Sequence, residues 1–266
     1  MVFELRSLDK ARFIFKTPTI HLALEQILAG VTSSPVYVDD INQPKSAVTW
    51  TNSCVYLAGD PMNNEFIKYF NVVMNAQFFQ AFLVGSKFNV YPDSPKWIPV
   101  LKQQFWDLKV KDGVRRYYES ELKDNYEVSL PLGYNIVDVT YELVRKPLKN
   151  IENLLKEMIS EYESVEEALK RVFGVAAISD EELAGWCLSE YNLGNRFEVG
   201  LETIEDHRWK GIATAMGKTL ANKAKANGYE HLGWHCWTWN EASNATAIKL
   251  GLKLVAEYPA LLVALN

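Results

Sequence analysis

The sequence predicts an α/β protein built on a mixed sheet, and three observations carry this prediction. The second half of the chain alternates short runs rich in β-branched and aromatic residues with segments of helical periodicity. The most regular helical segment, 208–226, directly follows the strand-like segment 196–203. With 266 residues, 48% of them hydrophobic, the chain can bury a sizeable core in one large domain or two smaller ones.

The first half of the chain is expected to form strands and turns with a few helices. The segments 36–40 and 47–57 are rich in β-formers and flank the turn-forming residues 42–45, which predicts a hairpin. The segment 64–82 places apolar side chains at helical spacing, so we expect an amphipathic helix packed on that hairpin. The remaining expected elements are a short helix at 96–106 and a strand at 114–118.

A break at residues 131–133 separates the two halves, and we place the domain boundary there. Residues 1–130 are expected to form an N-terminal α+β domain, and residues 131–266 a second domain. The expected elements of the second domain are a strand at 134–144, two helices between 149 and 172, strands at 173–178, 184–190 and 196–203, a helix at 208–226, a strand at 231–239, a helix at 241–250 and a last strand near Leu261. No internal repeat is evident in the sequence.

Charge and composition exclude several classes of function. The chain has 28 Lys and Arg against 33 Asp and Glu, and it has no basic run, so nucleic acid is not expected as a partner. Its apolar runs are shorter than the roughly 20 residues that cross a bilayer, and its start lacks a signal-peptide pattern. Three well-separated cysteines argue against a disulfide framework. We therefore expect a cytoplasmic protein without a membrane partner.

The most informative stretch is 203–213, which leads from the end of a strand through a turn into a helix. The first turn of a helix has four N–H groups without intrahelical partners and a partial positive charge, so such a turn can hold an anion. Gly211 and Ala213 leave room for phosphate oxygens, and Arg208 and Lys210 add positive charge. Taken alone, the pattern Arg-x-x-Gly-x-Ala is short, and a tight turn that needs a glycine explains it equally well.

This pattern resembles the pyrophosphate loop of the GNAT superfamily of N-acetyltransferases, whose signature is Arg or Gln, two residues, Gly, one residue and then Gly or Ala. A second superfamily signature is an Asn followed by a helix that ends in Lys-x-Gly and an apolar residue. The residues that resemble it are Asn240, Lys249, Gly251 and Leu252. The order of elements from Tyr134 onward is also similar to the GNAT order.

Several segments are similar, more narrowly, to the GNAT group that includes zwittermicin-resistance-type acetyltransferases. These segments are 36–40, 57–60, 186–191, 196–203, 234–237 and Tyr258-Pro259. The similarity extends into the first half of the chain. Whether the N-terminal domain is itself a degenerate GNAT-like half stays open at this point.

The resemblance implies that the chain transfers an acetyl group from acetyl-CoA, its cosubstrate, to a primary amine of a small molecule such as an antibiotic or metabolite. The pantetheine arm would lie between the diverging strands 196–203 and 231–239 and bond their main chain, and an N–H group near Leu201 would meet the acetyl carbonyl. Asn240 would support the arm or the splayed backbone. The residues expected to bind the cosubstrate are Leu201, Thr203, Arg208, Trp209, Lys210, Gly211, Ile212, Ala213, Thr214, Asn240 and Ser243.

A protonated amine must lose a proton before it attacks, so a carboxylate is the expected general base. Glu198 and Glu202 are the candidates, and Glu202 is favoured because it lies nearer the turn in sequence. Both alternate with apolar residues, so in a regular strand they share the face opposite the apolar one. Two solvated carboxylates on an outer face are the competing interpretation, and a bulge in this strand could re-aim either of them.

One residue departs from the family pattern. Many GNAT enzymes have a Tyr seven residues after the Asn that protonates the departing thiolate, and this sequence has Ala247 there. Tyr258 is the candidate replacement, although a Tyr before a Pro near a strand is typical of packing. The departure motivates a second hypothesis, a regulatory module that binds acyl-CoA without turnover. A third, an aminoacyl transferase built from two such domains, is disfavoured by the acidic charge balance, which suits tRNA poorly.

No metal site is expected. His231 and His235 have the spacing of a zinc pair on a helix, but on a strand they would lie about 13 Å apart at roughly 3.3 Å per residue. Cys236 in the same segment is interpreted as a small buried thiol rather than a nucleophile. A homodimer is kept open as the oligomeric state.

Overall fold

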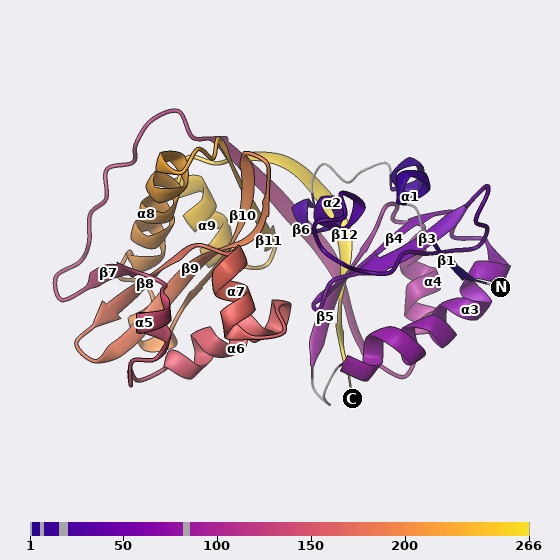
Figure 1. Cartoon of the computed structure of the whole chain (residues 1–266), viewed down its shortest axis with the longest axis horizontal. Helices are drawn as coiled ribbons and strands as arrows, with labels where there is room; N and C mark the ends of the chain where they lie inside the picture. The colour runs from indigo at the N-terminus through magenta and orange to yellow at the C-terminus, as the bar shows by residue number, and fades with distance from the viewer. Residues whose placement is uncertain (1, 6–7, 16–20, 82–85, 266) are drawn as a thin grey trace. The chain divides into compact units, whose positions relative to one another are not determined.

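The computed structural model of the chain describes residues 2–5, 8–15, 21–81 and 86–265 (Figure 1). Its contacts divide the chain into two compact units. The N-terminal unit consists of Met1–Arg115 with Glu257–Asn266, and the second unit consists of Arg116–Ala256. The predicted boundary between residues 130 and 131 therefore falls inside the second unit.

The N-terminal unit contains a mixed sheet. Its strand order is β1-β2-β3-β4-β5-β12-β6, in which only the last part of β12 and the first part of β6 belong to this unit. The strands from β1 to β4 pair antiparallel, β4 and β5 pair parallel, and β5 and β12 pair antiparallel. In chain order its elements are β1 (Phe3–Glu4), α1 (Asp9–Ile14), α2 (Leu22–Leu28), β2 (Tyr37–Val38), β3 (Ser46–Trp50), β4 (Cys54–Gly59), α3 (Asn64–Val73), η2 (Met74–Phe78), η3 (Phe79–Ala81), β5 (Lys87–Pro92), α4 (Trp97–Gln104) and β6 (Lys109–Glu121).

The predicted elements of this unit are confirmed in type but not in every bound. The segment 47–57 was expected to be one strand, but it forms the hairpin β3 and β4, because Thr51 turns the chain by accepting hydrogen bonds from the N–H groups of Ser53 and Cys54. The predicted helix 64–82 begins as α3 and continues as a π turn and a 3-10 turn, and its last residue lies outside the described residues. The helices α1 and α2 were not predicted.

Helices cover both faces of the N-terminal sheet, with α1 and α2 on one side and α3 and α4 on the other (Figure 1). The α3 and α4 side holds an aromatic core. Its fully buried large side chains are Phe66, Phe78, Phe88, Trp97 and Phe105. Leu261 and Val263 of β12 belong to the same core and are 0% exposed.

The second unit also contains a mixed sheet, with the strand order β7-β8-β9-β10-β11-β6. The strands from β7 to β10 pair antiparallel, and β10 and β11 pair parallel. In chain order its elements after β6 are β7 (Asn135–Asp138), α5 (Tyr141–Val144), α6 (Ile151–Glu161), α7 (Val165–Arg171), β8 (Gly174–Ser179), β9 (Glu182–Leu193), β10 (Arg196–Thr203), η4 (Glu205–His207), α8 (Ile212–Ala226), β11 (His231–Trp237), α9 (Glu241–Lys249) and the start of β12 (Lys253–Ala264).

This order matches the sequence-based elements closely, although the predicted helix 208–226 begins only at Ile212 and one predicted strand is shorter than expected. The predicted strand 134–144 ends at Asp138, and a short helix, α5, replaces its second part. The reason is local, because the Thr140 side chain accepts a hydrogen bond from the Leu143 N–H group and caps that helix.

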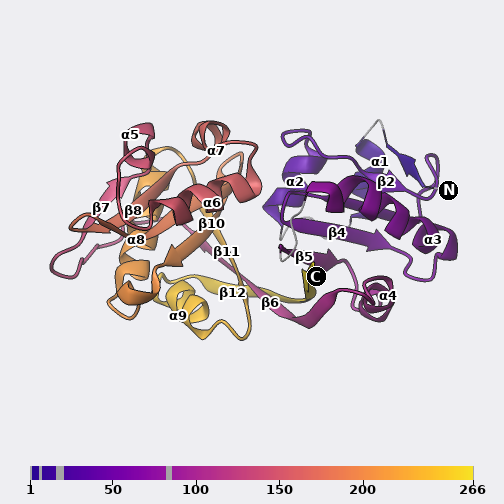
Figure 2. The ribbon, with the colours of Figure 1, turned by 90° about the horizontal axis from the view of Figure 1, so that it is seen from below.

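Two cores lie on opposite faces of the second sheet. One core packs α8 and α9 on the sheet through residues such as Met216, Leu220 and Ala247. The other core packs α6 and α7 through residues such as Leu154 and Met158. Figure 2, seen from below, shows α6 in front of the strands of this unit. Side chains on the face of β10 and β11 opposite α8 are thus separated from the α8 core by the sheet.

The two units share one topology. Leaving out α5 and the short 3-10 and π turns, each half of the chain runs β-α-α-β-β-β-α-β-α-β, with the same antiparallel pairs and one parallel pair across a helix. The last strand of each half is exchanged, because β12 neighbours β5 in the N-terminal unit and β6 neighbours β11 in the second. The fold therefore contains a repeat that the sequence does not reveal. The N-terminal half has the same topology as the second half.

Candidate active site

The turn between β10 and α8 folds as the sequence predicts. After the 3-10 turn η4, Trp209 and Gly211 both adopt positive φ, 66° and 81°. Gly211 takes the N-cap position of α8, and no side chain caps the helix. A Cβ atom at Gly211 would meet no heavy atom within 4 Å, so the space beside this helix end is open. The first N–H groups of α8 therefore face an open space that an anion can enter.

Two cationic side chains form hydrogen bonds with this turn and with the end of β10. The Arg208 guanidinium donates to the Thr203 carbonyl oxygen and to Glu202 Oε1, both at 3.0 Å. Lys210 Nζ donates to the Asp206 carbonyl oxygen at 3.0 Å. Trp209 is 93% exposed. The turn thus gathers positive charge without blocking the helix end.

A buried histidine anchors the same turn. His207 is 8% exposed, and its Nδ1 atom lies 2.8 Å from the Tyr134 hydroxyl group. Its Nε2 atom lies 3.3 Å from Glu182 Oε1. The hydrogen bond from Lys149 and the nearby His207 imidazole hold the pKa of Glu182 below its usual range. The sequence pattern does not reveal this anchor, because its partners come from distant parts of the chain.

The strands β10 and β11 separate beside the turn. They pair only from Arg196 to Glu198, opposite His231 to Gly233, although both strands continue beyond these residues. The β11-facing edge of 199–203 therefore has no β11 partner within the described residues. Such an edge can bond an extended ligand like an additional strand. The Thr203 Oγ1 atom is buried here and has no hydrogen-bond partner among the described residues.

The predicted site residues after β11 have structural partners. Asn240 caps α9, because its Oδ1 atom accepts from the Ser243 N–H group at 3.1 Å. The Ser243 Oγ atom accepts from Trp234 Nε1 at 3.0 Å. Among the remaining predicted residues, Leu201 lies in β10. The first turn of α8 contains the other three, Ile212, Ala213 and Thr214.

We expect Asn240→Ala to lower the free energy of unfolding by about 1 kcal/mol, because it removes the cap of α9. Asn240→Asp keeps an acceptor oxygen at the cap and should leave stability nearly unchanged. Urea unfolding of both variants measures the difference. Equal stabilities for the Ala and Asp variants would show that the cap contributes nothing.

The two candidate carboxylates have different surroundings. The side chain of Glu202 is 50% exposed and forms an ion pair with Arg208 of the turn. Glu198 is 7% exposed, and its Oε1 atom lies 3.2 Å from His235 Nε2. The strand 196–203 itself has no additional residue; the register shift beside Glu198 and Val199 arises in the neighbouring strand β9, where Glu190 is the additional residue. The competing interpretation of two solvated carboxylates fits Glu202 better than Glu198.

Two glycines leave room for the side chains of Glu198 and Glu190 against the sheet. A Cβ atom at Gly233 would lie 2.9 Å from Glu198 Cγ and 3.1 Å from the Tyr117 ring. A Cβ atom at Gly200 would likewise collide with the Glu190 carboxylate, at 1.8 Å. These two glycines are therefore needed for close approach. Nothing in the local sequence pattern indicates which side chains cover them.

Other ionisable groups lie on the same face. Burial, and then the charge of Glu202, raise the pKa of Glu157 in α6 above its usual value. Burial, and then the carboxylates of Glu198 and Glu119, raise the pKa of Tyr117 well above its usual range. The electrostatic causes of these two shifts are the carboxylates of Glu202, Glu198 and Glu119, so the surroundings of β10 are acidic on this face.

Tyr258 belongs to the N-terminal unit. Its ring is 9% exposed and packs on His21 and Tyr91 at centroid distances of 4.8 and 5.9 Å. Packing accounts for this position, and a role as an acid stays a prediction. Ala247 is 0% exposed and lies in the core beneath α8, so it contributes no hydroxyl group to the site.

The equivalent turn of the N-terminal unit differs from the turn at Gly211. Asn63 caps α3 by accepting from the Phe66 N–H group, and Asp60 accepts from the Met62 N–H group. The parallel pairing of β4 and β5 continues over four residues, from Cys54 to Leu57, without the early separation seen in β10 and β11. The anion-binding features thus lie in the second unit and not in the described residues of this turn.

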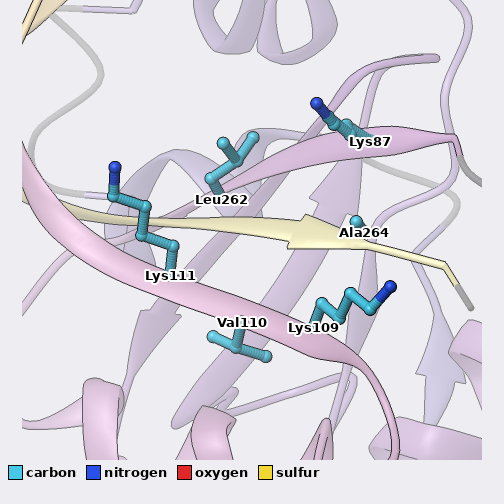
Figure 3. Close-up of a pocket in the computed structure, with 6 residues that line it drawn as sticks. All are labelled: Lys87, Lys109, Val110, Lys111, Leu262 and Ala264. Carbon is cyan, nitrogen blue, oxygen red and sulfur yellow. The ribbon is translucent and has the colours of Figure 1, made fainter.

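A shallow hollow lies on the N-terminal unit between β5, β12 and β6 (Figure 3). Its lining residues are Lys87, Lys109, Val110, Lys111, Leu262 and Ala264. The three lysine side chains end at separate places around the hollow rather than at one point (Figure 3). This arrangement does not form a common binding point for one anion.

The described residues contain no group of three or more His, Cys, Asp or Glu side chains placed to hold a metal ion. Within the same residues, no helix has both the length and the apolar character needed to cross a bilayer.

The sequence profile of the GNAT acetyltransferases matches residues 12–261 of the chain. This chain belongs to the GNAT acetyltransferase family. An uncharacterised N-acetyltransferase from Bacillus subtilis (strain 168), YdfB, is 26% identical over 243 residues, which cover 90% of this chain and 87% of that protein. The predicted N-acetyltransferase class is confirmed.

Solved structures show the same GNAT fold. A GCN5-related N-acetyltransferase-like protein from Streptococcus suis superposes with a TM-score of 0.74 at 20% identity and covers 96% of this chain and 97% of its own. A tandem GNAT protein from the clavulanic acid biosynthesis pathway superposes with a TM-score of 0.59 at 9% identity and covers 98% of both chains. The fold prediction is confirmed over both halves of this GNAT protein. The narrower resemblance to the zwittermicin-resistance-type group stays a prediction.

Proposed function

We propose that this GNAT acetyltransferase uses acetyl-CoA to acetylate a primary amine of a small molecule. The observation that supports the proposal most strongly is one juxtaposition in the second unit. The open, uncapped N-terminus of α8 directly follows a strand whose neighbour separates from it after Glu198. An anion and an extended arm can therefore bind side by side at the end of β10.

The residues present fit this cosubstrate. The N–H groups at the start of α8 and the Lys210 ammonium group suit a pyrophosphate. The free edge of 199–203, which includes Leu201 and Thr203, suits the amide groups of a pantetheine arm. Acetyl-CoA supplies the acetyl group in activated form, as a thioester.

The chain's own groups favour a cationic acceptor. Glu198 and Glu190 lie on the face of the sheet opposite α8, and Glu157 of α6 adds to the negative charge near Glu202. Carboxylates in such a site attract an ammonium group and raise its local concentration. Glu198 is the best-placed proton acceptor, because Glu202 is engaged by Arg208 of the turn. This assignment replaces the preference for Glu202 that sequence distance suggested.

A second candidate function is acyl-CoA binding without turnover. Its support is Ala247, which is buried where many family members place an acidic hydroxyl group. In the catalytic proposal, the attacking nitrogen gives its second proton to the departing thiolate, so that no tyrosine at this position is required.

Two measurements on the full chain test the proposal. Calorimetry with acetyl-CoA should give saturable binding at one site per chain. A panel of mono-, di- and polyamines should then give amine-dependent release of free thiol from acetyl-CoA. Binding without thiol release for any amine would favour the non-catalytic function, and no binding would contradict both functions.

A further inference from the structure

His235 of β11 lies against Glu198, the proposed proton acceptor. It is two residues beyond Gly233, the last residue of β11 that pairs with β10. Its Nε2 atom lies 3.2 Å from Glu198 Oε1, and the two side chains are only 12% and 9% exposed. The pair therefore lies where β10 and β11 begin to separate.

Both partners of this pair are held in place by packing. The His235 ring stacks on the Tyr117 ring, with a centroid distance of 4.6 Å and an interplanar angle of 27°. Glu198 crosses β11 over Gly233, where no side chain blocks its path. Burying a carboxylate costs free energy, and a hydrogen bond to an imidazole offsets part of that cost.

We infer that His235 is a positioning residue, which orients the Glu198 carboxylate toward the gap between β10 and β11, where that carboxylate accepts the acceptor's proton. The inference rests on the proposed acetyl transfer and assigns it a residue that the family signatures do not include. It also explains why Glu198, rather than Glu202, is buried.

A primary ammonium group gives one proton to the Glu198–His235 pair, which later releases it to solvent. The neutral nitrogen then forms a bond to the acetyl carbon, and the carbon–sulfur bond breaks. The nitrogen's second proton leaves with the sulfur as free thiol, so the net products are the acetylated amine, CoA and one proton.

The pair must be unprotonated to accept that proton. The other ionisable groups around the pair are Tyr117 and Glu119 of β6, Arg196 of β10 and Glu190 of β9.

Two substitutions separate positioning from mere packing. His235→Gln keeps an N–H donor that can reach Glu198 but cannot be protonated. His235→Phe keeps a ring against Tyr117 but removes the hydrogen bond. We expect kcat of the Gln variant within about 5-fold of wild type, and kcat of the Phe variant lower by 10-fold or more, as is usual when a proton-transfer group is misplaced. The Kd for acetyl-CoA should be unchanged in both.

The decisive readout is the difference in kcat between the Gln and Phe variants. If His235 served only to pack on Tyr117, the Phe variant, which keeps the ring, should be at least as active as the Gln variant. Equal rates for the two variants, or a faster Phe variant, would overturn the inference.

A second readout does not need activity. The four histidines of the chain can be observed by nitrogen-15 NMR, and loss of one signal in His235→Gln assigns His235. Its Nε2 resonance should shift in Glu198→Gln but not in Glu202→Gln, and an unchanged resonance would overturn the pairing itself. A wild type that binds acetyl-CoA but acetylates no amine would overturn the proposed function, and with it the catalytic role of the pair, whatever the NMR result.

Discussion

Replacing Ala213 with Glu should abolish acetyl-CoA binding without damaging the fold. Ala213 is the second residue of α8 and is only partly buried, so a longer side chain has room there. A carboxylate in the first turn of a helix usually stabilises the helix by about 0.3–1 kcal/mol. The same carboxylate would occupy the anion site and repel a pyrophosphate. We expect the Kd for acetyl-CoA to rise by about 100-fold or more, the cost of placing like charges in contact in a partly desolvated site.

A folding defect would lower both the stability of the protein and its affinity for acetyl-CoA. Ala213→Glu should instead lower the affinity while the stability stays the same or rises. Calorimetry measures the affinity, and thermal unfolding without ligand measures the stability. Ala213→Gln is the matched control, since it adds nearly the same volume without charge and should weaken binding far less. If the Glu variant binds acetyl-CoA as tightly as wild type, the anion site is not at this turn.

Glu198→Gln should reduce kcat by about 10²- to 10⁴-fold, the usual loss when a general base is removed. The amide keeps the size of the side chain and can still bond His235, so the strands should keep their arrangement. The Kd for acetyl-CoA should stay within about 2-fold of the wild-type value, because the cosubstrate turn is untouched. Steady-state rates with a verified amine, combined with calorimetry, measure both quantities.

Glu202→Gln is the matched control on the same strand. It removes the ion pair with Arg208, whose oxygen–nitrogen distance is 3.0 Å, and should therefore affect the turn more than proton transfer. We expect a modest rise in the Kd for acetyl-CoA and a small change in kcat. Reversed results for the two variants would restore Glu202 as the base, and full activity in both would place the base elsewhere.

The turn at Gly211 could be predicted from sequence because its determinants are local. The strand, the glycine and the regular helix follow one another within a short segment, and each has a pattern of its own. The Glu198–His235 pair could not be predicted in this way. The two residues come from different strands, and their meeting depends on a parallel pairing that ends early and on a glycine between them.

The same limit explains two larger omissions. The sequence predicts strands at 114–118 and near Leu261, but it does not choose their neighbours, because alternation of side chains is alike in every strand. The repeat was missed for a related reason. The turn after β4 has Asn63 at the helix cap and Asp60 three residues before it, where the turn after β10 has Gly211 and Arg208, so the functional motif of the second copy is absent from the first.

The exchange of the last strands affects the order in which the two units fold during synthesis. During synthesis the N-terminal segments leave the ribosome first, yet β5 pairs with β12, and Leu261 and Val263 complete the core around Phe88. Such distant pairing delays folding, since the closing contacts wait for a long loop to form. The N-terminal unit therefore cannot finish folding before β12 has been translated. The first unit to be started is among the last to be completed, and its unfinished β5 edge is exposed to chaperones and to aggregation in the interval.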